Sequence, residues 1–293
     1  MLQRIKFLIR FSKTSAKAFF TFRNTLVTQN PEINTLAQKI IQHHPAKKIY
    51  LLGSTREKKG IETIFSLTTE GIASTKYYFT LVLIEKSKDA TLSIVQDKYE
   101  NNLLHWIPST VMVIYLDDFT QWLNNGHYFA KSVIEKAALI YEDDDTALPS
   151  PAPVNEEVRK KANELLHSQT LCKVESFLAG AELFRSKEEY KLSVFMLHQA
   201  AEQCLRAMLI ITIGLRVISH NIDKMLRYAS MYTQEAAGIF SKENKGNKRL
   251  LKLLNAAYLG ARYREDNYNI TLEELERLTE KVKAIKQLFE KHK

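Results

Sequence analysis

The chain has 293 residues, enough for two domains of ordinary size, with 45% hydrophobic and 26% charged residues. This composition excludes collagen-like, low-complexity and largely disordered proteins. The formal net charge of the chain is +9. The first 25 residues contain six basic side chains and no acid. Only 9 glycines are present, which argues against a doubly wound nucleotide-binding fold with several Gly-rich loops.

Residues 1–28 form a basic N-terminal segment. Arg10 and Lys13 interrupt its apolar stretch, so it lacks the apolar core of a signal peptide. We expect a basic amphipathic helix, with an organellar or membrane-surface address as the alternative. No apolar run is long enough to span a bilayer. Cys172 and Cys204 are too few for a disulfide framework or a four-cysteine zinc site, so we expect a cytoplasmic protein without a structural metal.

Residues 29–145 mix helical and strand-like patterns and predict an α+β domain. A helix is expected from Glu32 to His43, ended by Pro45. Further helices are expected over 90–104, over 120–125 with Asp117 and Asp118 as caps, and over 129–138. Segments rich in β-branched and aromatic residues predict strands at 48–52, 61–67, 77–85, 111–116 and 139–141.

A proline-rich linker follows at 146–154. Pro149, Pro151 and Pro153 alternate there, which forces extended backbone and predicts a domain boundary. Residues 155–292 then show only helical patterns. Asn155 is positioned to cap a helix to about residue 185, a second runs from 188 to Gly214, and a third starts near Asn221. A fourth spans 248–264, and a capping box at 271–274 starts the last, giving a bundle of four to five helices.

The first strand runs into Gly53-Ser54, where backbone N–H groups and a hydroxyl can hold a phosphate; an ordinary turn is the alternative. The order of helix, strand, Gly-Ser and two further strands resembles the minimal nucleotidyltransferase fold. In that family an Asp-x-Asp pair on the next strand binds metal, and a Phe…Ile…Leu-x-Tyr segment closes the domain. The matching residues here are Gly53, Ser54, Phe129, Ile134, Leu139 and Tyr141.

The metal-binding acids of that family do not match. Tyr78 and Thr80, or their close neighbours, stand where the Asp-x-Asp pair falls, and the strand at 111–116 carries no carboxylate. Two-metal phosphoryl transfer needs carboxylates to hold Mg²⁺. The resemblance therefore implies a domain that has lost catalysis and needs no cofactor, with Mg²⁺ expected only if it is active. A surviving adenylyltransferase would have to recruit acids such as Glu62 or Glu85.

Three segments of the helical part, FMLHQAAEQCLRAML (195–209), SHNIDKML (219–226) and ARYREDNYN (261–269), resemble signatures of the HEPN family of small helical bundles. HEPN bundles are often fused to nucleotidyltransferase domains, and the whole chain resembles bacterial nucleotidyltransferase–HEPN fusion proteins. The resemblance covers about 155–292 and implies a homodimer formed through the bundle.

Polar residues in these segments are the candidate ligand site. His198, Glu202 and Arg206 recur every four residues and therefore share one helix face. They predict either a structural hydrogen-bond network or a site for a nucleotide or RNA. Arginine next to an aromatic ring suits phosphate binding and base stacking. The candidate ligand-binding residues are His198, Glu202, Arg206, His220, Arg262, Tyr263, Arg264 and Asp266, with Gly53 and Ser54 as a weaker nucleotide site.

Many HEPN domains cut RNA without metal, using an Arg followed by a His after four to six residues. Only three residues separate Arg216 from His220, and no His follows Arg262 or Arg264 at that spacing. The sequence therefore predicts a nucleotide- or RNA-binding regulatory module that is not a nuclease. The alternative is a toxin-like, metal-independent endoribonuclease that uses Arg216 and His220. Related modules act in stress or defence.

Overall fold

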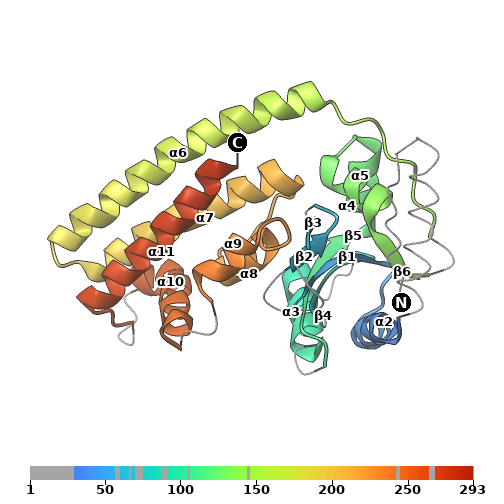
Figure 1. Cartoon of the computed structure of the whole chain (residues 1–293), viewed down its shortest axis with the longest axis horizontal. Coiled ribbons are helices and arrows are strands. Elements are labelled where there is room, and N and C mark those ends of the chain that lie inside the picture. The colour runs from blue at the N-terminus through green and yellow to red at the C-terminus, as the bar shows by residue number, and fades with distance from the viewer. Residues whose placement is uncertain are drawn as a thin grey trace, which may run out of the picture.

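A computed structural model describes residues 30–56, 60–65, 67–69, 75–86, 91–103, 106–143, 146–241, 245–263 and 268–292. The basic segment 1–28 lies outside these ranges. A sheet with its helices occupies one end of the molecule, and the long helices occupy the other (Figure 1). The predicted order of an α+β part followed by a helical bundle is therefore confirmed.

The sheet is mixed, as predicted. Its strands β1 (Lys48–Arg56), β2 (Gly60–Thr63), β3 (Leu67–Thr69), β4 (Thr75–Ile84) and β5 (Ser109–Tyr115) lie in the order β3-β2-β1-β4-β5, and β6 (Ala138–Glu142) also pairs with β1. β4 and β5 are parallel and the other pairs are antiparallel. The segment 61–67, predicted as one strand, is divided between β2 and β3.

The two faces of the sheet are covered by different helices. The helices α2 (Pro31–His43) and α3 (Leu92–Leu103) pack on the face that carries Tyr78 and Val82. Phe79 and Leu81 point to the opposite face, because side chains alternate along a strand, and they pack there with α4 (Leu116–Asn124) and α5 (Tyr128–Lys136). The prediction that Asp117 and Asp118 cap α4 is wrong. Tyr115 holds the cap position, and both acids lie exposed in the first turn, where the helix dipole favours them.

The bundle contains α6 (Glu156–Ser186), α7 (Tyr190–Ile213), α8 (Ile222–Ala229), α9 (Gln234–Ile239), α10 (Lys245–Tyr263) and α11 (Leu272–Lys291). α7 is the central helix and contacts α6, α8, α10 and α11. The predicted caps at Asn155 and Asn221 and the capping box at Thr271 and Glu274 are confirmed. The short helix α9 was not predicted, because six residues are too few to display a helical period.

Gly214 ends α7 at a point where another residue would not fit. Its φ is +76°, the left-handed conformation that favours glycine. A Cβ there would also lie 2.9 Å from the ring of Tyr128 on α5. The end of α7 is therefore packed against the sheet-bearing part of the chain.

The two parts share one hydrophobic core and are linked by hydrogen bonds around α8. Arg227 Nη1 donates to Glu100 Oε2 of α3 at 2.8 Å, and Gln96 Nε2 donates to Tyr228 Oη at 2.5 Å. Thr63 Oγ1 donates to the carbonyl of Met231 at 2.5 Å. α8 and the residues just after it therefore connect the bundle to α3 and β2. Residues 146–155 between the two parts are neither helix nor strand, and the domain limits stay predictions.

Across the described ranges, no helix has the length and apolar composition that a membrane span requires.

Candidate functional site

The predicted polar stripe is present on α7, and the loop 214–221 lies against it. Glu202 is only 2% exposed. Its Oε1 accepts from Arg206 Nη2 at 2.7 Å, and its Oε2 accepts from His220 Nδ1 at 3.0 Å. Arg206 Nη2 also donates to the carbonyl of Ser219 at 3.1 Å. One buried carboxylate thus holds two basic side chains and, through them, the loop. We refer to His198, Glu202, Arg206 and His220 as the α7 cluster.

His198 is the innermost member of the α7 cluster and is fully buried. Its Nε2 donates to the carbonyl of His220 at 2.9 Å, and its Nδ1 accepts from Gln199 Nε2 at 3.3 Å. Burial lowers the pKa of His198, so the ring is neutral near pH 7, in agreement with one nitrogen donating and the other accepting. A ligand cannot touch this ring without moving the loop, so His198 positions His220.

Tyr258 of α10 completes this region and was not predicted. The His220 ring stacks on it with centroids 3.9 Å apart and an interplanar angle of 14°. The His220 side chain remains 48% exposed, so one side of the pair faces solvent. Tyr258 precedes Arg262 by four residues, and this spacing from a candidate arginine is the sequence signal that could have pointed to Tyr258.

The remaining predicted residues are only partly described. Arg262 and Tyr263 are the last two residues of α10, and the structure does not describe their side chains. Arg264 and Asp266 lie outside the described residues. Arg216 is exposed in the loop 214–221 that also carries His220. The structure therefore brings His198, Glu202, Arg206 and His220 together and leaves the placement of the other four untested.

Gly53 and Ser54 do not end the first strand, as the sequence suggested. They lie inside β1, where Gly53 pairs with Thr63 and Phe79, and Ser54 with Glu62 and Tyr78. A strand paired on both edges directs its backbone N–H groups into the two ladders. The β1 hydroxyl that lines a cavity is that of Thr55.

The strand β4 has no carboxylate where the nucleotidyltransferase acids would stand. Tyr78 Oη donates to Glu32 of α2 at 2.8 Å, so this ring faces away from the bundle. Tyr77 and Phe79 face the bundle instead. Glu85 is not a substitute, because it follows the far end of β4 and pairs with Lys47 at 3.1 Å. The side chain of Glu62 is not described. These residues do not fit a pair of Mg²⁺ ions, and no group of three potential metal ligands occurs among the described residues.

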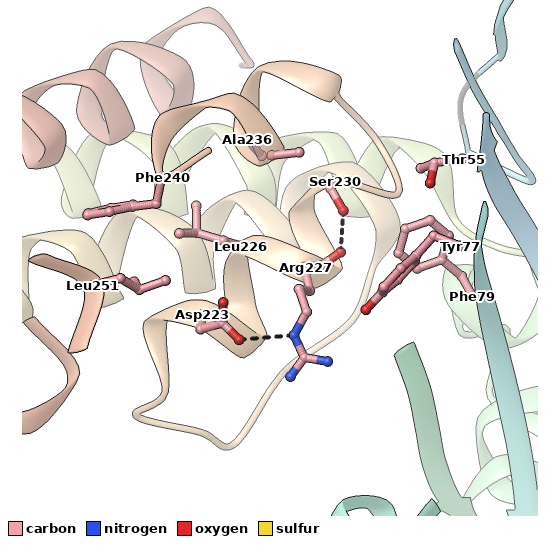
Figure 2. A pocket seen from close by; sticks show the side chains of 11 residues that line it. Thr55, Tyr77, Phe79, Asp223, Leu226, Arg227, Ser230, Ala236, Phe240 and Leu251 are labelled. Atoms are coloured by element: carbon pink, nitrogen blue, oxygen red, sulfur yellow. Dashed lines mark hydrogen bonds and ion pairs between the residues drawn. The ribbon is translucent and has the colours of Figure 1, made fainter. Parts of the chain in front are cut away.

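A cavity of about 240 Å³ lies where the sheet meets α8, α9 and α10 (Figure 2). We refer to it as the junction cavity. Tyr77 Oη bonds Thr110 Oγ1 at 2.7 Å, and Arg227 Nε donates to Asp223 Oδ2 at 3.2 Å. The sequence did not predict this cavity, since its walls come from segments more than 140 residues apart. It is lined by Thr55, Tyr77, Phe79, Asp223, Leu226, Arg227, Ser230, Ala236, Ala237, Phe240 and Leu251.

Comparison with known proteins identifies the helical part. Residues 168–292 match the HEPN domain family, so the C-terminal region carries a HEPN domain, as its three motifs predicted. Among solved structures, the chain is similar to a nucleotidyltransferase-like protein from Exiguobacterium sibiricum 255-15. The identity is 15%, 87% of this chain and 89% of that chain are covered, and the TM-score is 0.22. No curated protein matches the chain.

Proposed function

We propose that this chain is a nucleotide- or RNA-binding regulatory module that does not cut RNA. The HEPN match supports a nucleotide- or RNA-related function. The absence of carboxylates facing the bundle at Tyr77 and Phe79 supports a loss of nucleotidyl transfer in the other part.

The half-exposed stack of His220 on Tyr258 is the observation that carries this proposal. Arg206 is 31% exposed beside it, and Arg216 is exposed on the same loop. Aromatic rings next to guanidinium groups bind unstacked bases and phosphates. Arg262 follows Tyr258 by four residues in the sequence, so we include Arg262 and Arg264 among the residues proposed to bind the ligand. In this arrangement Glu202 and His198 hold the surface residues in place and do not touch the ligand.

The test compares two double variants that remove the same charge. We expect R262A/R264A to weaken the binding of a labelled single-stranded RNA and of ATP at least ten-fold, measured by fluorescence anisotropy and calorimetry. The control K248A/K252A changes two exposed lysines that precede Arg262 by 14 and 10 residues on α10, and it should alter each Kd less than two-fold. The proposal fails if the wild type binds neither RNA nor ATP, or if both double variants weaken binding equally.

A metal-independent endoribonuclease is the second candidate function, and one contact favours it. Glu202 holds Nδ1 of His220, and a carboxylate in that position orients a histidine as a general base. Arg216 would steady the phosphate in this version. Wild-type protein would then cut RNA in the presence of EDTA, and His220→Ala would stop it.

A homodimer through the bundle is part of the proposal. Val158, Leu165 and Leu183 are exposed on the outer side of α6, and Cys172, also exposed, lies on the same stripe. If two α6 helices pair antiparallel with Cys172 at the two-fold axis, each Leu165 lies opposite the small Ala179, and each Leu183 lies opposite Lys161. We expect Leu165→Glu to shift the protein from dimer to monomer in sedimentation velocity. A wild type that is monomeric at every concentration contradicts this part.

We also propose a cytoplasmic location, supported by the two cysteines. Burial raises the pKa of the Cys204 thiol to about 12, which makes it unreactive. Cys172 is an exposed free thiol, and such a thiol persists best in a reducing compartment.

A further inference from the structure

The junction cavity has two unlike walls. Tyr77 and Phe79 form the sheet side, and Leu226, Phe240 and Leu251 form the helical side (Figure 2). The centroids of the Tyr77 and Phe79 rings lie 5.4 Å apart and their planes are tilted by 59°, so the two rings form an aromatic wall in which they are inclined to each other. Ligand pockets are typically apolar with a few polar groups that fix orientation. At about 240 Å³ this one is smaller than the usual range and suits a single ring system.

The polar groups of the junction cavity lie between these walls. Arg227 and Asp223 come from one turn of α8 and are paired through Nε of Arg227. A carboxylate accepts from an amino group, and a guanidinium donates to a ring nitrogen or carbonyl. Side by side, they match a ring whose edge carries both kinds of group, as the edge of a nucleobase does.

The charges around Arg227 argue against a phosphate in the junction cavity. Glu100 contacts Arg227 Nη1 at 2.8 Å, and Asp223 contacts its Nε at 3.2 Å. One guanidinium thus faces two carboxylates, and the local balance is negative. An anion would be repelled here, whereas an uncharged ring would not.

We propose that the junction cavity binds an uncharged nucleobase ring, as a free base or nucleoside, between β4 and α8. The ring stacks on Tyr77 beside Phe79, and its polar edge meets Asp223 and Arg227. This site is separate from the surface around His220, and the class of ligand rests on the proposed nucleotide function. Because the ring touches both parts of the chain, its binding stabilises their association.

The test uses calorimetry of the full chain with adenosine, guanosine, cytidine and uridine. At least one nucleoside should bind, and Asp223→Asn should weaken it about ten-fold or more, since the change removes a charged acceptor at the polar edge of the ring. Tyr77→Ala should weaken it similarly, whereas Tyr77→Phe keeps the ring and should stay within two-fold. Asp118→Asn, an exposed acid on α4, is the matched control. Ala237→Trp, at an exposed wall position, should block binding without opening the core.

The same titrations in R262A/R264A separate this proposal from the proposed function. Nucleoside affinity should be unchanged in that variant. If it is lost there, the nucleoside binds at the α10 surface, so the cavity proposal is overturned while the proposed function stands. The cavity proposal is also overturned if none of the four nucleosides binds, or if D223N, Y77A and A237W all bind like the wild type.

Discussion

The α7 cluster and the junction cavity contain similar residue types but differ in how those residues are used. In the α7 cluster, the central carboxylate of Glu202 is buried and accepts from Arg206 at 2.7 Å and from His220 at 3.0 Å. In the junction cavity, Arg227 and Asp223 also pair, but they border open space next to two aromatic rings. Polar groups that pair with one another at the centre of a bundle hold segments together, whereas polar groups at the edge of a cavity remain able to meet a ligand.

Removing the central carboxylate should have the largest effect on stability. Glu202→Ala leaves Arg206 and His220 without their shared partner and detaches the loop 214–221 from α7. We expect a loss of about 3 kcal/mol in the free energy of unfolding, measured in urea. Glu164→Ala removes an exposed acid from α6 and should change it by less than about 0.5 kcal/mol. Equal effects would mean that the α7 cluster does not hold the loop.

Breaking the ion pair between α8 and α3 should have a smaller effect on the free energy of unfolding. Arg227→Ala removes the contact between α8 and Glu100 of α3, whose side chain is 14% exposed and would lose its partner. We expect a loss of about 2 kcal/mol in the free energy of unfolding. Arg185→Ala breaks a pair with Glu182 on the exposed surface of α6 and should lower the free energy of unfolding clearly less than Arg227→Ala does. If Arg227→Ala costs no more than this control, α8 is not held to the sheet by that ion pair.

The smallest effect should appear in the pH dependence of stability. Because burial lowers the pKa of His198, the folded protein resists protonation of this ring, while the unfolded chain takes up the proton near pH 6.5. The unfolded state therefore binds more protons at lower pH, and stability falls as the pH drops below about 6.5. In His198→Gln this fall should be shallower between pH 7 and pH 5. His127 and His292, whose pKa values are also lowered by burial, contribute equally to both proteins. Identical slopes would contradict a buried neutral His198.

The sequence alone predicted the features that depend only on residues close to one another along the chain. Asn155 and Gly214 mark helix ends by their local chemistry, and the spacing of His198, Glu202 and Arg206 places them on one face of any helix. These features do not depend on the rest of the fold. The HEPN motifs are likewise short segments that can be recognised one at a time.

Features that need distant segments were not predicted. Tyr258 meets His220 only because α10 packs on α7, and Tyr77 meets Arg227 only through the docking of α8. Ser54 was placed at a strand end because the continuation of β1 depends on pairing with β2 and β4. Strand length is set by such partners, which a local pattern does not contain.

The most direct test of the central claim, binding of RNA without cleavage, is one incubation resolved on two gels. Labelled single-stranded RNA is mixed with wild-type protein or H220A in EDTA, then run on native and denaturing gels. We predict a shifted band on the native gel for the wild type and full-length RNA on the denaturing gel for both proteins. Cleavage by the wild type that disappears in H220A would contradict the account and establish the endoribonuclease.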